Sequence, residues 1–147
     1  MREIDKEFMS LAIKEAGKSV YPFGAVLVKD GKIVTKSGSG ENSEFEPANH
    51  AEINVIRKAF QKNKNRNLKG GILYTTCEPC PMCFSASWYA NIDKIIYLLS
   101  IEESSKLFYP EIKISIEELN KKGDNKIKKC GDPNLKKEII KIYKKEL

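Results

Sequence analysis

Residues 76–83 read TCEPCPMC, and this stretch joins a short apolar strand, expected over 71–76, to a helix, expected over 81–90. Proline suits the first position of that helix, because a backbone N–H there would have no partner within the helix. Cys80 and Cys83 lie one helical turn apart, so both sulfurs can reach one metal ion. Unpaired N–H groups and positive potential at a helix start also favour thiolates. The stretch therefore predicts a metal site where a strand passes into a helix.

A second motif, HAE, begins at His50 and opens another predicted helix. Zinc prefers nitrogen and sulfur ligands, and catalytic zinc sites use three protein ligands and leave the fourth position to water. His50 is the candidate third ligand beside Cys80 and Cys83. Glu52 follows two residues later, where a carboxylate can take a proton from zinc-bound water and pass it on. The spacing favours a catalytic zinc site with Glu52 as its acid and base.

The cysteines leave other interpretations open. Three of the four lie within seven residues, which in a reducing compartment favours metal or redox chemistry over disulfides. A structural zinc site would need Cys77 as a fourth ligand and would leave Glu52 without a role. Cys77 is otherwise a small buried residue at a strand end, and Cys130 is a plain thiol. A redox role for the pair at 80 and 83 is the least favoured.

Helical and strand patterns alternate along the chain. An Asp-Gly turn at 30–31 indicates a hairpin, and the polar residues 37–49 indicate a loop. The chain offers no linker, so residues 1–147 are expected to form one α/β domain. Helices are expected over 3–18, 50–62, 81–90, 101–107, 115–122 and 133–147, and strands over 22–28, 32–36, 71–76, 94–99, 111–114 and 126–129.

The composition is that of an ordinary globular domain, with 147 residues, 41% of them hydrophobic and 31% charged. The net charge of +6 resides in residues 120–147, which hold ten Lys against two Asp and two Glu. Such a basic segment can bind nucleic acid, but it also fits a Lys-rich surface, since only three of the 26 basic residues are Arg. No apolar run reaches the roughly 20 residues that a membrane span needs, and no signal peptide is visible, so a cytoplasmic protein is expected.

Four segments of the chain resemble the cytidine and deoxycytidylate deaminase superfamily. His-x-Glu followed by Pro-Cys-x-x-Cys is the signature of its zinc deaminases. The resemblance covers residues 1–100, is weak beyond them, and is closest to the guanine deaminases and related bacterial nucleobase and nucleoside deaminases. The segments are PFGAV at 22–26, HAEIN at 50–54, TCEPCPMC at 76–83 and WYANI at 88–92.

The resemblance implies a three-layer α/β/α sandwich with a mixed, roughly five-stranded sheet, and a homo-oligomer, first of all a dimer. One zinc ion per chain would be held by His50, Cys80 and Cys83, with Glu52 as the catalytic residue. The implied reaction is hydrolytic deamination of a purine-type nucleobase or nucleoside, and guanine-like compounds are the favoured substrates. A carbonyl replaces an exocyclic amine, and ammonia leaves.

Three residues are implied to contact the substrate. Asn42 matches an Asn with which relatives hold it, Phe23 matches the guanine-deaminase form of the first strand, and Trp88 is suited to stack on a purine. Phe23 and Trp88 also fit roles in the core, and Trp88 fits a dimer interface. Residues 106–112, KLFYPEI, depart from a Phe-Asp-Asp-like segment with which guanine deaminases read the purine, and Glu111 is the acidic residue found there.

Other functions remain open on the sequence. A tRNA-specific adenosine deaminase shares the motifs, and the basic segment suits RNA. A pyrimidine deaminase is a further option. A catalytically inactive zinc-binding relative would bind the metal and release no ammonia, and the intact Glu52 argues against it. In some relatives the last helix completes a neighbour's active site, and the sequence leaves this open.

Overall fold

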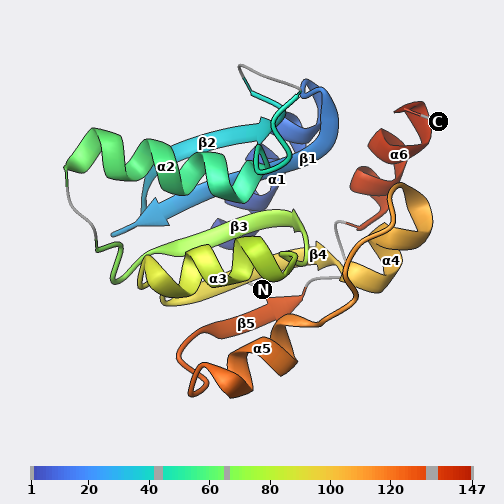
Figure 1. The fold of residues 1–147 in the computed structure, drawn as a ribbon. Coiled ribbons are helices and arrows are strands. Elements are labelled where there is room, and N and C mark those ends of the chain that lie inside the picture. The colour runs from blue at the N-terminus through green and yellow to red at the C-terminus, as the bar shows by residue number, and fades with distance from the viewer. Residues whose placement is uncertain (1, 42–44, 65–66, 132–135, 147) are drawn as a thin grey trace.

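A mixed five-stranded sheet forms the centre of the computed structural model, with its strands in the order β2-β1-β3-β4-β5 (Figure 1). The structure describes residues 2–41, 45–64, 67–131 and 136–146. β1 runs antiparallel to β2 and to β3, whereas β3, β4 and β5 are parallel. The strands are β1 (Tyr21–Lys29), β2 (Lys32–Ser39), β3 (Ile72–Cys77), β4 (Lys94–Leu99) and β5 (Lys128–Gly131). The helices are α1 (Glu3–Gly17), α2 (Ala51–Asn63), α3 (Pro81–Tyr89), α4 (Ile101–Leu107), α5 (Ile116–Lys122) and α6 (Lys136–Glu146).

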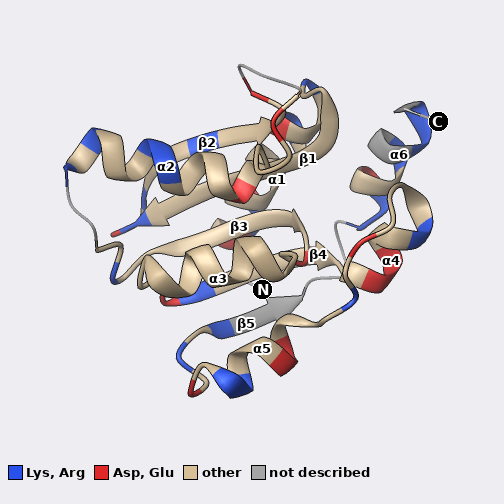
Figure 2. Cartoon of the chain, in the orientation of Figure 1, with Lys and Arg blue, Asp and Glu red and all other residues tan. Residues whose placement is uncertain are grey.

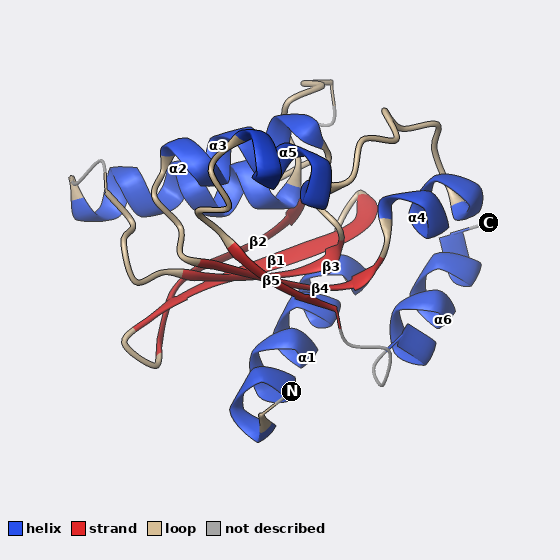
Figure 3. Cartoon of the chain, turned by 90° about the horizontal axis from the view of Figure 1, so that it is seen from below, coloured by secondary structure: helices blue, strands red, loops and turns tan. Residues whose placement is uncertain are grey.

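Helices cover both faces of the sheet. α2, α3 and α5 lie on one face, and α1 and α6 lie on the other (Figure 3). Successive residues of β1 alternate between the two faces, because strand side chains have a period of two. Ala25 and Leu27 belong to the apolar cluster that includes α2, whereas Val26 and Val28 belong to the cluster that includes α1. The predicted three-layer α/β/α sandwich with a mixed sheet is confirmed.

The hairpin between β1 and β2 turns at the predicted Asp-Gly pair. Asp30 and Gly31 both have positive φ angles, 52° and 71°. Two-residue hairpin turns of the commonest kind require such angles at both central positions, and Asp-Gly adopts them readily. The turn sets the register in which β2 pairs with β1.

The predicted loop over 37–49 begins later than expected, because β2 continues to Ser39. Gly38 pairs with Gly24, and Ser39 pairs with Tyr21. Pairing with an existing strand outweighs the low strand preference of small polar residues. The extra residues carry the chain to the edge of the sheet where the candidate site lies.

The predicted strand over 111–114 does not form, and this prediction is wrong. Ile112 and Ile114 alternate in sequence, but they are 68% and 39% exposed, so the segment has no buried face on which a strand could pack. β4 is already flanked by β3 and β5. The segment instead links α4 to α5 and places Glu111 beside a pocket.

Charged residues are distributed unevenly among the helix ends (Figure 2). Acidic residues lie at the starts of α4 and α5, where capping boxes form between Ser100 and Glu103 and between Ser115 and Glu118. Lys and Arg residues occur on α2, α4, α5 and α6. Among the helices that the structure describes, none has both the length and the apolar character of a membrane span.

Candidate active site

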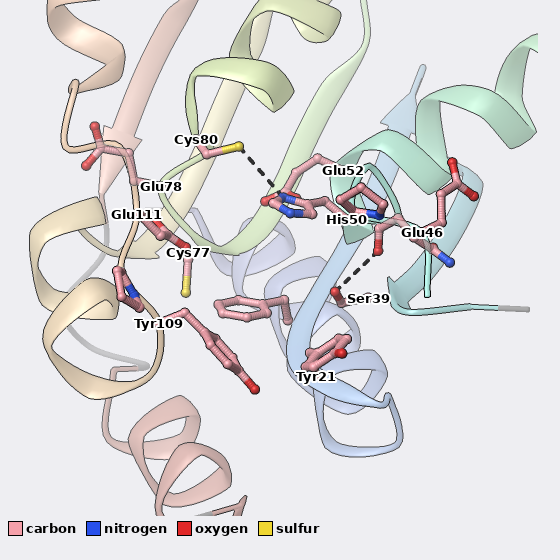
Figure 4. A pocket seen from close by; sticks show the side chains of 14 residues that line it. Tyr21, Ser39, Glu46, His50, Glu52, Cys77, Glu78, Cys80, Tyr109 and Glu111 are labelled. Carbon is pink, nitrogen blue, oxygen red and sulfur yellow. Dashed lines mark hydrogen bonds between the residues drawn. The ribbon is translucent and has the colours of Figure 1, made fainter. Parts of the chain in front are cut away.

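Two helices begin close together at one edge of the sheet. β3 ends at Cys77 and leads through a short turn into α3, whose N-cap is Cys80, while the N-cap of α2 is His50. A side chain at this position usually accepts a hydrogen bond from its own helix, but neither of these does so. Both side chains point instead into the space between the two helices (Figure 4).

His50, Cys80 and Cys83 form a compact group of nitrogen and sulfur donors. Nδ1 of His50 lies 3.7 Å from Sγ of Cys80 and 3.5 Å from Sγ of Cys83, and the three donor atoms lie within 4.8 Å of one another. Hydrogen bonds from Cys83 and His50 lower the pKa of the Cys80 thiol to about 4. The hydrogen bond with Cys80 and burial raise the pKa of Cys83. One nitrogen and two sulfurs, one of them already favoured as a thiolate, fit a zinc ion, so these three residues could hold it.

Glu52 lies beside this donor group in the first turn of α2 and is buried. The Oγ1 hydroxyl of Thr75 donates a hydrogen bond of 2.6 Å to Oε1 of Glu52. Burial raises the pKa of the Glu52 carboxyl, and the hydrogen bond from Thr75 opposes that effect. A buried carboxyl group with a raised pKa is suited to accept and return a proton near neutral pH.

A cavity of about 330 Å³ opens beside these residues (Figure 4). Tyr21 and Phe23 from β1 and Tyr109 from the segment after α4 line it. The rings of Tyr21 and Tyr109 meet edge to face with centroids 5.8 Å apart, and those of Phe23 and Phe108 meet at 6.4 Å. Small-molecule sites typically enclose roughly 300–1,000 Å³ and combine apolar walls with a few polar groups. The cavity is therefore suited to a small, flat heterocycle.

Glu111 adds a further carboxyl group to the pocket lining. Burial raises its pKa to about 7, and the negative charges of Cys80 and Glu52 add to this effect. The hydroxyl of Ser104 lies 3.5 Å from its Oε2 and is the donor there. The sequence marks Glu111 only as a departure from the guanine-deaminase pattern, because no local spacing links it to the two motifs. The fold brings it to them.

The predicted substrate contacts on β1 and in the following loop have separate outcomes. Phe23 lines the pocket, as expected for a substrate contact, and it also packs against both apolar clusters of the core. Asn42 lies outside the described residues. Its proposed role therefore stays a prediction.

Trp88, the third predicted substrate contact, lies on α3, and its role toward a substrate stays a prediction. Its Nε1 donates a hydrogen bond of 3.0 Å to the carbonyl of Gly123, and Nζ of Lys126 lies 4.4 Å from the centre of its ring. Trp88 follows Cys83 by five residues, which places the two side chains roughly 140° apart around the helix. Trp88 thus packs α3 against the end of α5 and is absent from the described lining of the pocket.

Cys77 stays outside the donor group. It is buried at the end of β3 and lines the pocket. Across the described residues, His50, Cys80 and Cys83 form the one group of three or more such side chains with ligand atoms close enough to share an ion. The arrangement supplies no fourth protein ligand, which a structural zinc site would need. The side chain of Cys130 lies outside those described.

Asn49 is a buried residue next to the donor group whose importance the sequence does not reveal. Its Nδ2 donates a hydrogen bond of 2.8 Å to the carbonyl of Glu41, and its Oδ1 accepts one of 2.6 Å from Nδ2 of Asn54. Asn54 is itself buried on α2. These bonds hold the residue that precedes His50 and thereby the entry into α2. The sign of this role in the sequence is that Asn49 and Asn54 stand on either side of His50, a candidate metal ligand.

A buried carboxylate beside one nitrogen and two sulfur donors, at the starts of two helices, is the arrangement of a zinc hydrolase site. The family model for the cytidine and deoxycytidylate deaminase zinc-binding region matches residues 2–99. The chain belongs to this family, as its motifs predicted.

Relatives of two kinds match the chain to a comparable degree. A guanine deaminase from Bacillus subtilis is 43% identical over 76 residues, which are 52% of this chain and 49% of the relative. A tRNA-specific adenosine deaminase from Agrobacterium fabrum is 40% identical over 94 residues, which are 61% of this chain and 62% of the relative. The X-ray structure of guanine deaminase from Bacillus subtilis is similar with a TM-score of 0.69 and 33% identity, over 76% of this chain and 73% of that chain. The matches with the two relatives span about half to three fifths of their own length.

Proposed function

We propose that this protein is a zinc-dependent hydrolytic deaminase of a purine-type nucleobase or nucleoside. Guanine-like compounds are the favoured substrates. The protein replaces an exocyclic amine by a carbonyl and releases ammonia. The observation that carries the proposal is the position of Glu52, which is buried beside the His50–Cys80–Cys83 donor group and lines the same aromatic-walled pocket. A carboxylate at that place is needed for proton transfer but not for holding a metal.

Each residue of the site has a distinct role in this reaction. His50, Cys80 and Cys83 hold the zinc ion, which when bound supplies the Lewis acidity that makes water a nucleophile at neutral pH. Glu52 accepts a proton from the attacking water. It then donates that proton to a ring nitrogen. It takes a second proton from the hydroxyl group that the attacking water has added to the ring carbon and passes it to the departing amine, so that a carbonyl forms and ammonia leaves.

Glu111 supports guanine as the first substrate to test. A guanine ring presents two adjacent N–H donors, at N1 and at its 2-amino group, whereas adenine presents an acceptor at N1. A carboxylate accepts hydrogen bonds, and donors from a bound ring would favour its ionised form despite the raised pKa. Glu111 would therefore hold a guanine-like ring and leave the corresponding edge of adenine without a matching partner.

The alternative function is tRNA-specific adenosine deamination. The relative from Agrobacterium fabrum supports it, since its identity to this chain is close to that of the guanine deaminase. The ten Lys residues of the segment 120–147 would then contact RNA phosphates. This alternative predicts binding that weakens steeply with salt, whereas deamination of a free base would depend little on salt.

One experiment separates these functions. Zinc-loaded protein is assayed for ammonia release from guanine, adenine, cytosine, their nucleosides and a tRNA anticodon stem-loop. A Glu52→Gln variant serves as the control, because it keeps the volume of the side chain and its acceptor oxygen but cannot take up a proton. Activity on guanine that the control lacks supports the proposal, and activity confined to the stem-loop supports the alternative. Bound zinc without ammonia from any substrate indicates an inactive relative and contradicts both.

We further propose one zinc ion per chain, a single domain over residues 1–147 and a homodimer in the cytoplasm. Zinc content per chain, measured by plasma mass spectrometry, tests the first statement. Light scattering after gel filtration tests the dimer. Limited proteolysis that leaves no stable fragment shorter than the full chain supports a single domain.

A further inference from the structure

Thr75 lies in the middle of the sheet and places a hydroxyl group against the proton-transferring carboxylate. β3 is flanked by β1 and β4, where Thr75 pairs with Ala25 and Tyr97. It is 1% exposed. Its Oγ1 donates a hydrogen bond of 2.6 Å to Oε1 of Glu52.

The strand itself does not require a hydroxyl group at this position. Central strands favour β-branched apolar residues, and valine has nearly the shape of threonine without the polar atom. A buried hydroxyl group destabilises the fold unless it finds a partner, and the hydrogen bond to Glu52 supplies that partner. The neighbouring Thr76 is equally buried, but its Oγ1 accepts a hydrogen bond from the backbone N–H of Gly24 at 3.2 Å. Of these two threonines, Thr75 is the one that contacts the carboxylate.

The hydrogen bond from Thr75 holds one particular oxygen of Glu52. Oε1 accepts from the Thr75 hydroxyl, and it can continue to accept whether the carboxyl group is ionised or protonated. The hydrogen bond can therefore hold Oε1 in both states of the carboxyl group. A charge-assisted hydrogen bond of this length also limits rotation of the carboxyl group.

We propose that Thr75 is a positioning residue for the deamination: its hydroxyl group holds Oε1 of Glu52 and thereby fixes the orientation of the carboxyl group. This inference rests on the proposed function of Glu52. Proton transfer demands close geometry, so a carboxyl group released from this bond would spend less time in the productive orientation. The loss should affect the chemical step and leave substrate binding largely intact.

Three variants test the proposal. Thr75→Val removes the hydroxyl group and keeps the shape, Thr75→Ser keeps the hydroxyl group, and Thr76→Val removes the neighbouring buried hydroxyl group as a matched control. With guanine as substrate, we expect Thr75→Val to lower kcat roughly 10- to 100-fold with KM within about twofold of wild type. Thr75→Ser should retain kcat within a fewfold of wild type, and Thr76→Val should retain kcat although it loses thermal stability. Equal losses of kcat in Thr75→Val and Thr76→Val would overturn the proposal, as would wild-type kcat in Thr75→Val.

A second measurement does not depend on activity. Crystal structures of the Thr75→Val and Thr75→Ser variants, both without metal, report the orientation of the Glu52 side chain directly. We expect Glu52 to rotate away from its wild-type position in the valine variant and to keep it in the serine variant. An unmoved Glu52 in the valine variant would overturn the proposal. If wild-type protein deaminates no substrate, the proposed function fails, while these structures still decide whether Thr75 positions Glu52.

Discussion

A carboxylate oxygen of Glu78 accepts a hydrogen bond of 2.8 Å from the backbone N–H of Ile116, 38 residues further along the chain. The other oxygen accepts one of 2.9 Å from the backbone N–H of Ile101. Ile101 and Ile116 are the first residues of α4 and α5, so one side chain satisfies N–H groups that both helices leave without partners. Glu78 stands two residues before Cys80. It therefore joins the metal-binding turn to the segment that carries Glu111.

Replacing Glu78 by Gln should weaken this junction. Gln has one acceptor oxygen, and its amide N–H₂ group would face a backbone donor, which leaves one buried N–H without a partner. We expect the free energy of unfolding to fall by about 1–3 kcal/mol and KM for guanine to rise more than kcat falls. Urea unfolding and steady-state kinetics measure both. Glu118→Gln is the matched control, since Glu118 caps α5 from its exposed side, and equal losses in the two variants would contradict this role of Glu78.

Glu111→Gln tests whether Glu111 recognises a guanine-like substrate. The amide presents donors where the carboxylate presents only acceptors, so a guanine-like ring should lose affinity. We expect KM for guanine to rise roughly 10- to 100-fold, the equivalent of one lost charge-assisted hydrogen bond. Glu102→Gln, on the exposed side of α4, should leave KM unchanged. An unchanged KM in Glu111→Gln would remove the argument for guanine that rests on this residue.

Cys83→Ala tests the metal centre. One of three donor atoms is lost, and the remaining two bind zinc weakly. We expect the purified variant to lose most of its zinc and to melt at a lower temperature than the zinc-loaded wild type. Plasma mass spectrometry and calorimetry give the two values. Cys77→Ala should keep its zinc, because Cys77 lies outside the donor group, and loss of zinc there would show that the ligand set is incomplete.

The environment of the Asp5 carboxyl group leads us to expect that the stability of the fold depends on pH. Asp5 is buried and accepts hydrogen bonds from Arg2 at 3.0 Å and from Tyr74 at 2.5 Å. Burial raises the pKa of this carboxyl group, but the hydrogen bonds outweigh burial and lower the pKa from 3.8 to about 2. Because the pKa is lower in the folded chain, ionised Asp5 stabilises the fold above about pH 4, and this stabilisation is lost as the pH falls toward 2.

Asp5→Asn should therefore lower the free energy of unfolding at pH 7 by about 2 kcal/mol. Its stability should also decline less between pH 4 and 2 than that of wild type. Urea unfolding at a series of pH values measures both effects. Glu3→Gln is the control, because Glu3 lies in the same helix turn and is exposed. Parallel pH profiles for Asp5→Asn and wild type would contradict the prediction.

The sequence predicted the parts of the site that depend on local spacing. Cys80 and Cys83 are one helical turn apart, and their helix follows directly on a buried strand, so a few residues were enough to place them. His50 and Glu52 could be placed beside them because His-x-Glu followed by Pro-Cys-x-x-Cys is the signature of the zinc deaminases. The alternation of helices and strands predicted an α/β domain, and the resemblance to the deaminase superfamily implied its three layers.

Features that depend on distant partners could not be predicted in the same way. Glu111 lines the pocket from a segment whose two flanking helices both donate hydrogen bonds to Glu78, and no pattern near Glu111 encodes that contact. Trp88 lies five residues beyond Cys83, and its side chain contacts α5, whose position no pattern near Trp88 encodes. The alternating isoleucines at 112 and 114 suggested a strand, but the sheet had no place for one beside β4.

His50 and Cys80 occupy the N-cap positions of their helices without capping them. A capping side chain stabilises a helix by about 1 kcal/mol, and both helices lack this stabilisation at the proposed active site. Binding of a metal ion to these two residues would return rigidity to both helix starts, since binding to the folded state alone stabilises it. If these residues hold zinc as proposed, the two helices would connect metal supply to protein lifetime: chains made under zinc limitation would be less stable and would be degraded sooner than loaded ones.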